Sequence, residues 1–269
     1  MPSAKQLASS RMIRVSVIIP NYNHGEFLGE AVASVRAMRR ADVEMIVVDD
    51  GSTDECTRTE VDVIEATGVH VIRQDNQGPA AARNVGIIAS SGRYILPLDA
   101  DDRLRPNFIE RGVEILDANP KIGVIYGDAE RIAGNGMDSR RPLGFWGVGP
   151  FDRSALLYRN YIPVCALYRR IVWEQNGGYD RNVPFHLGED WDFWIGALEH
   201  GWEFHYIPEI VFDYRVSADS LVARTRGQGA KLARFVALKH GPLYRQAWLE
   251  LLNERNSTKA IDLLREDRT

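Results

Sequence analysis

The sequence lacks several features that would assign it to a specialised class of protein. Only two of its 269 residues are cysteines, Cys56 and Cys165, and their wide separation favours free thiols in a reducing compartment over disulfides or a metal site. No apolar run approaches the roughly 20 residues that span a bilayer. A basic excess is also missing, because 33 Lys and Arg face 37 Asp and Glu, so we expect no nucleic-acid partner.

Two common nucleotide-binding motifs are absent as well. The chain contains no Gly-x-x-x-x-Gly-Lys-Ser/Thr loop and no Gly-x-Gly-x-x-Gly after its first apolar run, which argues against a P-loop NTPase and a Rossmann dehydrogenase. The polar segment before Val15 holds basic residues but no apolar stretch, so we expect a flexible leader over residues 1–13 and no secretory signal. Cytoplasmic residence is the resulting expectation.

What the chain does contain is a series of apolar runs that each end in polar residues. Runs at 15–20 and 44–49 are typical of buried strands, and residues at helical spacing fill about 26–40 between them. This βαβ pattern predicts a parallel sheet with a right-handed crossover. Ligands of such sheets bind beyond the carboxyl ends of the strands, where these polar residues would meet.

The most informative run is Ile95–Leu98, which ends in Asp99, Asp101 and Asp102. A buried strand that delivers three carboxylates to one end gathers negative charge, which costs free energy unless a cation offsets it. Mg²⁺ and Mn²⁺ choose carboxylate oxygens and keep positions that phosphate oxygens can fill. The run therefore predicts a metal-assisted site for a nucleoside diphosphate, with a solvated acidic turn before a helix as the alternative.

Two other stretches allow more than one interpretation. Arg83, near the start of an expected helix, could bind a diphosphate or pair with an acid such as Asp99. Residues 189–194 alternate acids with aromatics at the start of another helix, which in the plain interpretation is a charged helix N-terminus with partly buried tryptophans. We favour a general base, Glu189 or Asp190, in a pocket with aromatic walls.

The second half of the chain is less specific. Residues 133–149, rich in Gly, Arg and Pro, predict a mobile loop over a site or a surface loop without a role. Two short strands are expected at 202–208 and 210–215, on either side of a proline. From about Gly229 the chain predicts helices with basic residues among apolar faces, which pack on the domain or form a homodimer, with peripheral contact to an anionic membrane as the alternative.

Five motifs, taken in order, resemble those of the family 2 glycosyltransferases. They are Val17–Asn23, Ile46–Asp54, Gln77-Gly78 with Ala82–Asn84, Leu98–Asp102 and Gly188–Asp190. The resemblance covers about residues 14–220 and implies the α/β GT-A fold, with a Rossmann-like, mainly parallel central sheet flanked by helices. We therefore expect a catalytic domain at 14–222, divided into a nucleotide-binding half (14–102) and an acceptor-binding half (103–222), and a helical C-terminal extension at 223–269.

The resemblance also implies roles for single residues on the donor side. Pro20 and Tyr22 would border the nucleobase, with Asn23 next to them. Asp50 would accept a hydrogen bond from the base, with Asp49 beside it. Because a carboxylate suits the N3 proton of uracil or thymine, a UDP- or dTDP-sugar is favoured as the donor.

Further roles fall on the acidic motifs. Arg83 would lie near the diphosphate or brace the acidic run Asp99-Ala100-Asp101, the DxD motif. In that motif Asp101 matches the metal-coordinating position and Asp99 the one that faces ribose or metal, while Asp102 would act behind them. Asp190 matches the general base, and Glu189 is the competing assignment.

Together these roles imply a metal-dependent, inverting glycosyltransferase. It would use Mn²⁺ or Mg²⁺ and move a sugar from a nucleotide-sugar donor to an acceptor hydroxyl in polysaccharide, lipopolysaccharide or other glycoconjugate synthesis. One departure concerns the metal, because Ser217 stands where the family often has a histidine, and Asp219 and His205 are the candidates to replace it. The alternatives are a sugar-phosphate nucleotidyltransferase and a non-catalytic module that binds nucleotide or glycan.

Overall fold

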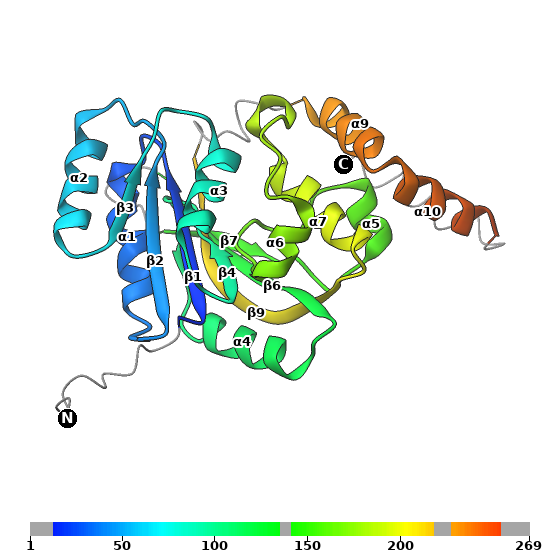
Figure 1. Cartoon of the computed structure of the whole chain (residues 1–269), viewed down its shortest axis with the longest axis horizontal. Coiled ribbons are helices and arrows are strands. Elements are labelled where there is room, and N and C mark those ends of the chain that lie inside the picture. Colours follow the sequence, from blue (N-terminus) through cyan, green and yellow to red (C-terminus); the bar gives the residue numbers. More distant parts are fainter. Residues whose placement is uncertain (1–12, 135–140, 218–226, 254–269) are drawn as a thin grey trace, which may run out of the picture.

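The computed structural model describes residues 13–134, 141–217 and 227–253, which form an α/β fold around one curled sheet (Figure 1). Most of the expected leader, the candidate ligand Asp219 and the end of the C-terminal extension lie outside these residues. The strands are β1 (Val15–Asn21), β2 (Val43–Asp49), β3 (His70–Arg73), β4 (Tyr94–Pro97), β5 (Arg103–Leu104), β6 (Ile122–Ala133), β7 (Pro142–Trp146), β8 (Leu167–Arg169) and β9 (Glu203–Val216). The helices are α1 (Gly25–Arg36), α2 (Glu55–Ala66), α3 (Pro79–Ala89), α4 (Phe108–Ala118), α5 (Arg153–Tyr158), α6 (Arg170–Asn176), the 3-10 turn η1 (Pro184–His186), α7 (Glu189–Glu199), α9 (Gly229–Lys239) and α10 (Gly241–Asn253).

The sheet follows the order β3-β2-β1-β4-β8-β6-β9-β5, and β7 pairs with β6. Its N-terminal half is parallel, as the βαβ pattern predicts, because β1 pairs in parallel with both β2 and β4. In this register Asn21 lies opposite Asp49. The carboxyl ends of β1, β2 and β4 therefore meet at one edge, which confirms the expected placement of their polar residues.

The C-terminal half of the sheet is mixed and differs from the prediction in two places. Residues 133–149 are not simply a loop, because β7 pairs antiparallel with the end of β6. The two strands expected around Pro208 are one strand, β9, which runs parallel to β6 along its length. Proline has no N–H to donate to the ladder, and the pairing passes over it by a register shift between Ile207 and Ile210.

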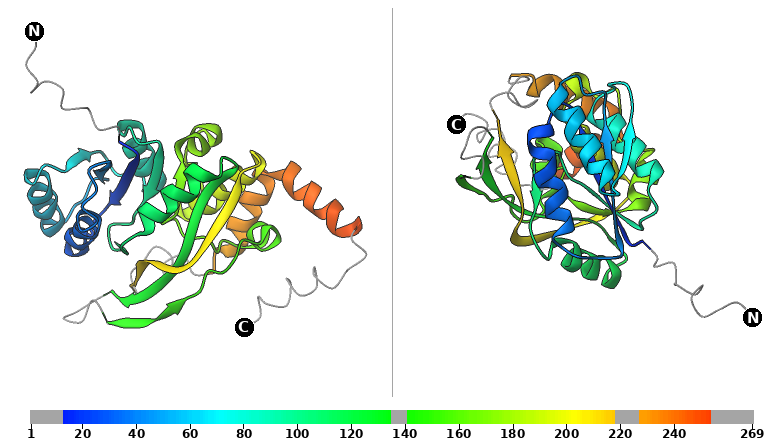
Figure 2. Two further views of the ribbon diagram at one scale, coloured as in Figure 1. Left: turned by 90° about the horizontal axis from the view of Figure 1, so that it is seen from below. Right: turned by 90° about the vertical axis from the view of Figure 1, so that its left-hand side faces the viewer.

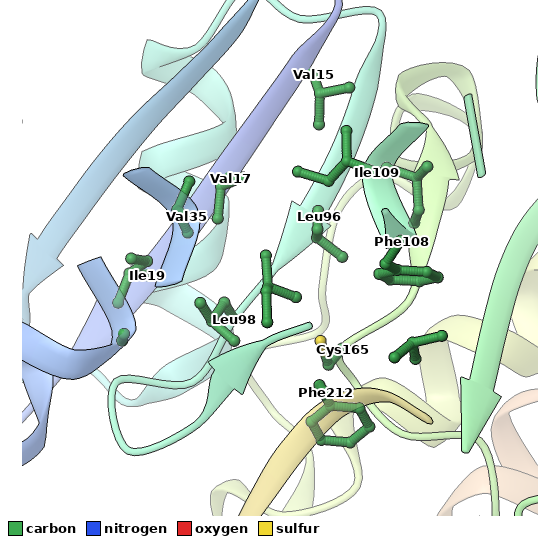
Figure 3. Close-up of a cluster of buried hydrophobic side chains, with 14 of the residues drawn as sticks. Val15, Val17, Ile19, Val35, Leu96, Leu98, Phe108, Ile109, Cys165 and Phe212 are labelled. Carbon is green, nitrogen blue, oxygen red and sulfur yellow. The ribbon is translucent and has the colours of Figure 1, made fainter. Parts of the chain in front are cut away.

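The alternation of side chains along the strands produces two hydrophobic layers. Val15, Val17 and Ile19 of β1 face one side and pack with residues of α1, α2 and α4 (Figure 3). Ile18, between them, faces the other side, where α3, α5, α6, α7 and α9 lie. Period-two alternation is expected of strands that are covered on both faces.

The C-terminal helices extend from the second layer. α9 is anchored there by the buried side chains of Leu232 and Val236. α10 projects from the body of the molecule and exposes Trp248 and Leu249 (Figures 1 and 2). Among the residues that the structure describes, none of the helices combines the length and the apolar character that crossing a bilayer requires.

Candidate functional site

The loops after β1 and β2 are joined to each other by short polar side chains. The Asn21 amide donates to Asp49 Oδ1 at 3.0 Å, and the backbone N–H of Asn23 donates to Ser52 Oγ at 3.0 Å. Asn23 also accepts from the Thr53 N–H at 2.8 Å and has a positive φ of 56°. The polar groups of Asp49 and Asn23 therefore already have partners in the protein, and their bonds stabilise the two loops at the edge of the sheet.

Two predicted base contacts differ sharply in their surroundings. Tyr22 is 42% exposed and presents its ring at the strand edge. Asp50 is buried and accepts from Gln74 Nε2 at 2.7 Å and from the N–H groups of Gln77 and Gly78 at 2.9 and 2.8 Å. These three bonds close the loop before α3. They use three of the about four acceptor positions that a carboxylate offers.

The acidic run after β4 is the most strained electrostatic feature of this edge. Burial raises the pKa of Asp101 above its usual value, His24 partly opposes the shift, and repulsion from Asp99 adds to it. Burial and the two neighbouring carboxylates raise the pKa of Asp102 well above its usual value. Ionised forms of these side chains are thus disfavoured until positive charge arrives, which is what a cation site requires.

Arg215 of β9 holds the acidic run in place. Its backbone N–H donates to Asp102 Oδ1 at 2.8 Å, and its Nε donates to the Asp101 carbonyl at 2.7 Å. The guanidinium also bonds Glu30 of α1 at 3.0 Å and lies over the Phe27 ring, 4.2 Å from its centroid. Asp102 is therefore bonded within the scaffold, and its role behind the DxD motif stays a prediction.

His24 is a site residue that the sequence interpretation missed. It lies just before α1, and its Nδ1 is 3.7 Å from Asp101 Oδ2. The signal was its place in the loop after β1, at the same strand edge. His205, by contrast, pairs with Ile125 ten positions before Arg215 on β9, about 33 Å of extended chain away, and the structure does not bring it to the acidic run.

The residues present fit a divalent cation that shares its coordination with phosphate. No group of three His, Cys, Asp or Glu side chains within the described part of the chain could hold a metal by itself. Mg²⁺ in nucleotide sites is usually held by one or two carboxylates and the substrate's phosphates, so Asp101 and Asp99 suffice in number. The raised pKa values of Asp101 and Asp102 support the same assignment.

Arg83 of α3 connects the acidic run to the start of α7. It is buried, donates to Asp99 Oδ1 at 2.7 Å and forms an ion pair with Glu189. Burial opposes its charge, but Asp99 and Glu189 raise the pKa of Arg83 further above its usual value. Of the two interpretations of Arg83, the structure shows the contact with the acidic motif.

The first turn of α7 presents two adjacent acids with different surroundings. Glu189 is buried against Arg83, whereas Asp190 is half-buried. Burial, together with repulsion from Glu189, raises the pKa of Asp190 to about 7, and a hydrogen bond from Asn160 limits the shift. A carboxyl group that titrates near neutral pH can accept a proton from a hydroxyl under cellular conditions. Asn160 was not expected from the sequence.

The two tryptophans among these acids are core residues. Trp191 and Trp194 are buried, and their indole N–H groups donate to the carbonyls of Leu156 and Ile162 at 2.6 and 3.3 Å. The aromatic ring near Glu189 and Asp190 is instead that of Tyr179, whose centroid is 5.7 Å from the Arg83 guanidinium. Alternation of acids and aromatics on a helix places them on different faces, because successive residues differ by about 100°.

The site cluster, defined here as Asp99, Asp101, Asp102, Glu189 and Asp190, is thus assembled around Arg83 from β4, α3 and α7.

Residues 16–177 of the chain match the sequence profile described as Glycosyl transferase family 2. The succinoglycan biosynthesis protein ExoO of Rhizobium meliloti (strain 1021) is 40% identical over 220 residues, which cover 77% of this chain and 62% of that protein. The chain spans between 27% and 40% of the length of the first five curated relatives it matches.

Solved structures provide a second comparison. The S. aureus TarS 1–349 structure in complex with UDP-GlcNAc has a TM-score of 0.63 at 17% identity and covers 84% of this chain and 66% of its own. The mannosyltransferase PcManGT from Pyrobaculum calidifontis, in complex with GDP-Man and Mn²⁺, has a TM-score of 0.61 at 18% identity and covers 86% of this chain and 65% of its own. At these identities the likeness establishes the fold.

Proposed function

This chain belongs to glycosyltransferase family 2 and has the GT-A fold, and we propose from that premise that it transfers a sugar from a nucleoside-diphosphate sugar to an acceptor hydroxyl with inversion. The observation that carries the proposal is the bridge formed by Arg83. It joins Asp99 of the acidic run to Glu189, the immediate neighbour of Asp190. A diphosphate-binding edge and a carboxylate with a pKa of about 7 are thereby held in one site.

In this proposal Asp190 is the general base. Its carboxylate takes the proton from the acceptor hydroxyl as that oxygen bonds to the anomeric carbon and the bond to the diphosphate breaks. One displacement of this kind inverts the anomeric carbon. Glu189 is less suited to the role because its carboxylate is paired with the buried Arg83, so it acts on Asp190 by raising its pKa.

Asp101 and Asp99 are the residues that would hold Mn²⁺ or Mg²⁺. When bound there, such a cation would offset negative charge on the departing nucleoside diphosphate. His24, whose Nδ1 lies 3.7 Å from Asp101 Oδ2, is the residue that would replace the histidine absent at Ser217. This assignment replaces His205 and leaves the acidic run to face the diphosphate.

For the donor, Tyr22 and Pro20 border the base, and Asp50 accepts from it. The exposed ring of Tyr22 supports stacking. The remaining acceptor position of Asp50 supports a pyrimidine with an N3 proton, in UDP or dTDP. The two structural neighbours carry UDP-GlcNAc and GDP-Man, so a guanine nucleotide is the competitor to test.

For the acceptor, the proposal is a hydroxyl of a growing polysaccharide or other glycoconjugate. Support comes from the relative ExoO, whose name places that protein in succinoglycan biosynthesis. The exposed Trp248 and Leu249 of α10 support peripheral contact with the cytoplasmic face of a membrane, where a lipid-linked acceptor would lie. Sedimentation with anionic vesicles tests this part, and equal recovery of the parent and Trp248→Ala would contradict it.

The experiment for the proposed function is calorimetric titration of UDP, dTDP and GDP with and without Mn²⁺, followed by a transfer assay. We expect one nucleotide to bind in the micromolar range, and the binding to weaken with chelator. NMR of the product reports its anomeric configuration, and retention would contradict a single displacement. Absence of binding by every nucleotide would favour a non-catalytic module.

A further inference from the structure

Helix α9 contacts the segment that carries the base at several points, all outside the site cluster. Before Asp190, Lys231 Nζ lies 5.6 Å from the centroid of the Phe185 ring in the turn η1. The contact is closer at Gly188. Its backbone lies so near the Leu232 side chain that a Cβ atom added there would overlap that side chain. Gly188 has a positive φ of 79°, which favours glycine in any case. α9 therefore backs the chain directly before the base.

After Asp190 in the chain, charged side chains at the end of α9 bond to residues of α7. His240, which follows the last residue of α9, is buried and bonds Asp192 Oδ1 through Nε2 at 3.0 Å and Glu199 Oε2 through Nδ1 at 2.7 Å. Asp192 and Glu199 are seven residues apart, on the same face of α7 two turns from each other. Lys239 donates to Asp192 Oδ2 at 2.7 Å and to Asp180 Oδ2 at 2.8 Å. These five residues are called the clasp cluster.

Most of the negative charge in the clasp cluster is compensated within the cluster. Three carboxylates, those of Asp180, Asp192 and Glu199, face two basic side chains, those of Lys239 and His240. A histidine that bonds two carboxylates must carry protons on both ring nitrogens. The charge also suits its place at the C-terminal end of a helix, where cations are favoured.

The position of Asp190 depends on these contacts because it lies between them. Gly188 is backed by Leu232 on one side, Asp192 is held by Lys239 and His240 on the other, and Asp190 is midway. Its own carboxylate accepts from the Trp191 N–H at 2.8 Å, so the local backbone fixes its direction. A shift of the first turn of α7 would move the carboxylate relative to Arg83 and the acidic run.

We propose that α9 is a positioning element for the base, and that His240 and Lys239 set the first turn of α7 by holding Asp192 and Glu199. The proposal rests on the proposed function, since it assigns His240 an effect on the transfer step. His240 touches neither donor nor base and is a positioning residue. Misplacement of a reacting group by about 1 Å can cost about 10²-fold in rate, so small shifts of α7 suffice.

The test compares His240→Gln with the parent in the full-length chain. Glutamine cannot bond both acids as a cation, so we expect a kcat about 10- to 100-fold lower with the donor KM within about twofold. His240→Arg keeps a cation with several donors and should recover most of the loss. The matched control is Glu250→Gln, which removes the ion pair of α10 with Arg153 but touches no residue of α7, and should leave kcat unchanged.

The pH profile provides a readout that general destabilisation would not produce. Burial opposes the charge of His240, but its bonds to Asp192 and Glu199 raise its pKa above the usual value. The clasp cluster is therefore intact below that pKa, and we expect kcat to fall as the pH rises through it. His240→Arg keeps its charge and should lose this alkaline limb, while the acidic limb near pH 7 from Asp190 stays.

A second measurement is independent of activity. Hydrogen exchange of the amides at 188–192 should be faster in His240→Gln than in the parent and unchanged in Glu250→Gln. If the parent transfers sugar but His240→Gln matches it in kcat and exchange, the inference is wrong and the proposed function stands. If the parent transfers no sugar from any donor, the proposed function fails, and the exchange data still decide whether α9 orders this turn.

Discussion

The clasp cluster and the site cluster are both rich in acidic side chains, and they differ in how the charge of these side chains is compensated. In the clasp cluster, burial opposes ionisation of Asp180, but bonds from Lys239 and Asn182 keep its pKa below the usual value. In the site cluster, burial and neighbouring carboxylates raise the pKa of Asp101 and Asp102. Every acid of the clasp cluster bonds a basic side chain of the same chain. In the site cluster Asp99 and Glu189 share Arg83, whereas Asp101 keeps a raised pKa and is the acid best prepared for a cation from outside.

The largest effect is expected at the base itself. Asp190→Asn keeps the size of the side chain but removes the proton acceptor, so the transfer rate should fall by about 10²- to 10⁴-fold. Donor affinity should be unchanged, because Asp190 contacts Asn160 and its own turn of α7. Nucleotide release measures the rate and calorimetry the affinity. A parental rate in this variant would transfer the role of base to another residue.

The same substitution in the clasp cluster should act on stability. Asp192→Asn removes the carboxylate that both Lys239 and His240 bond, and weakening a buried charged network costs about 1–3 kcal/mol of unfolding free energy. Urea unfolding measures the loss. Asp62→Asn, in an exposed ion pair with Arg73, is the control and should change stability by less than about 0.5 kcal/mol. Equal losses in both variants would remove the distinction between the clasp cluster and an ordinary surface pair.

In the site cluster, replacing an acid with its amide should raise the free energy of unfolding instead of lowering it. The pKa of Asp101 is raised in the folded protein, so ionisation of its carboxyl group above the usual pKa of 3.8 destabilises the folded state. Asp101→Asn should therefore raise the free energy of unfolding of the metal-free protein at neutral pH. Mn²⁺ with nucleotide should stabilise the parent and have a smaller effect on the variant. A loss of stability as large as that of Asp192→Asn would show that the two clusters are alike.

The smallest effect concerns the neighbour of the base. Repulsion from Glu189 contributes to the pKa of about 7 at Asp190, so Glu189→Gln should move the acidic limb of the rate profile to lower pH. The pH dependence of kcat/KM, measured between about pH 5.5 and 9, gives the position of the acidic limb, which reflects the pKa in the free enzyme. The variant also removes one partner of Arg83, so donor affinity is measured alongside. An unmoved limb would mean that another group controls it.

Much of the N-terminal half of the sheet could be predicted, because its strands are specified by residues that are neighbours in the chain. The runs at β1, β2 and β4 are apolar and end in polar residues, and parallel pairing then brings Asn21, Asp49 and the acidic run to one edge. The family resemblance added the roles of these residues. Strand periodicity and the direction of the crossovers were sufficient to place these residues at one edge.

The C-terminal half of the sheet depends on contacts between residues far apart in sequence, which patterns do not reveal. β7 forms only because β6 continues beside it, and β9 stays one strand because its partner carries the ladder past Pro208. The tryptophans of α7 proved to be core residues, since their direction depends on which face of α7 meets the sheet layer. His24 and Asn160 reach the site from loops that gave no chemical signal of their own.

The sequence by itself determined the family and the parallel half of the sheet, and it predicted the acids of the site cluster. Each of these follows from residues that are neighbours in the chain or from the period of a strand. Only the tertiary structure decided that Arg83 bonds Asp99 and Glu189, and that α9 grips α7 through His240 and Lys239. The reason is that charge compensation acts through space, so which acids are paired and which are left for a ligand depends on side chains that meet only when the layers pack.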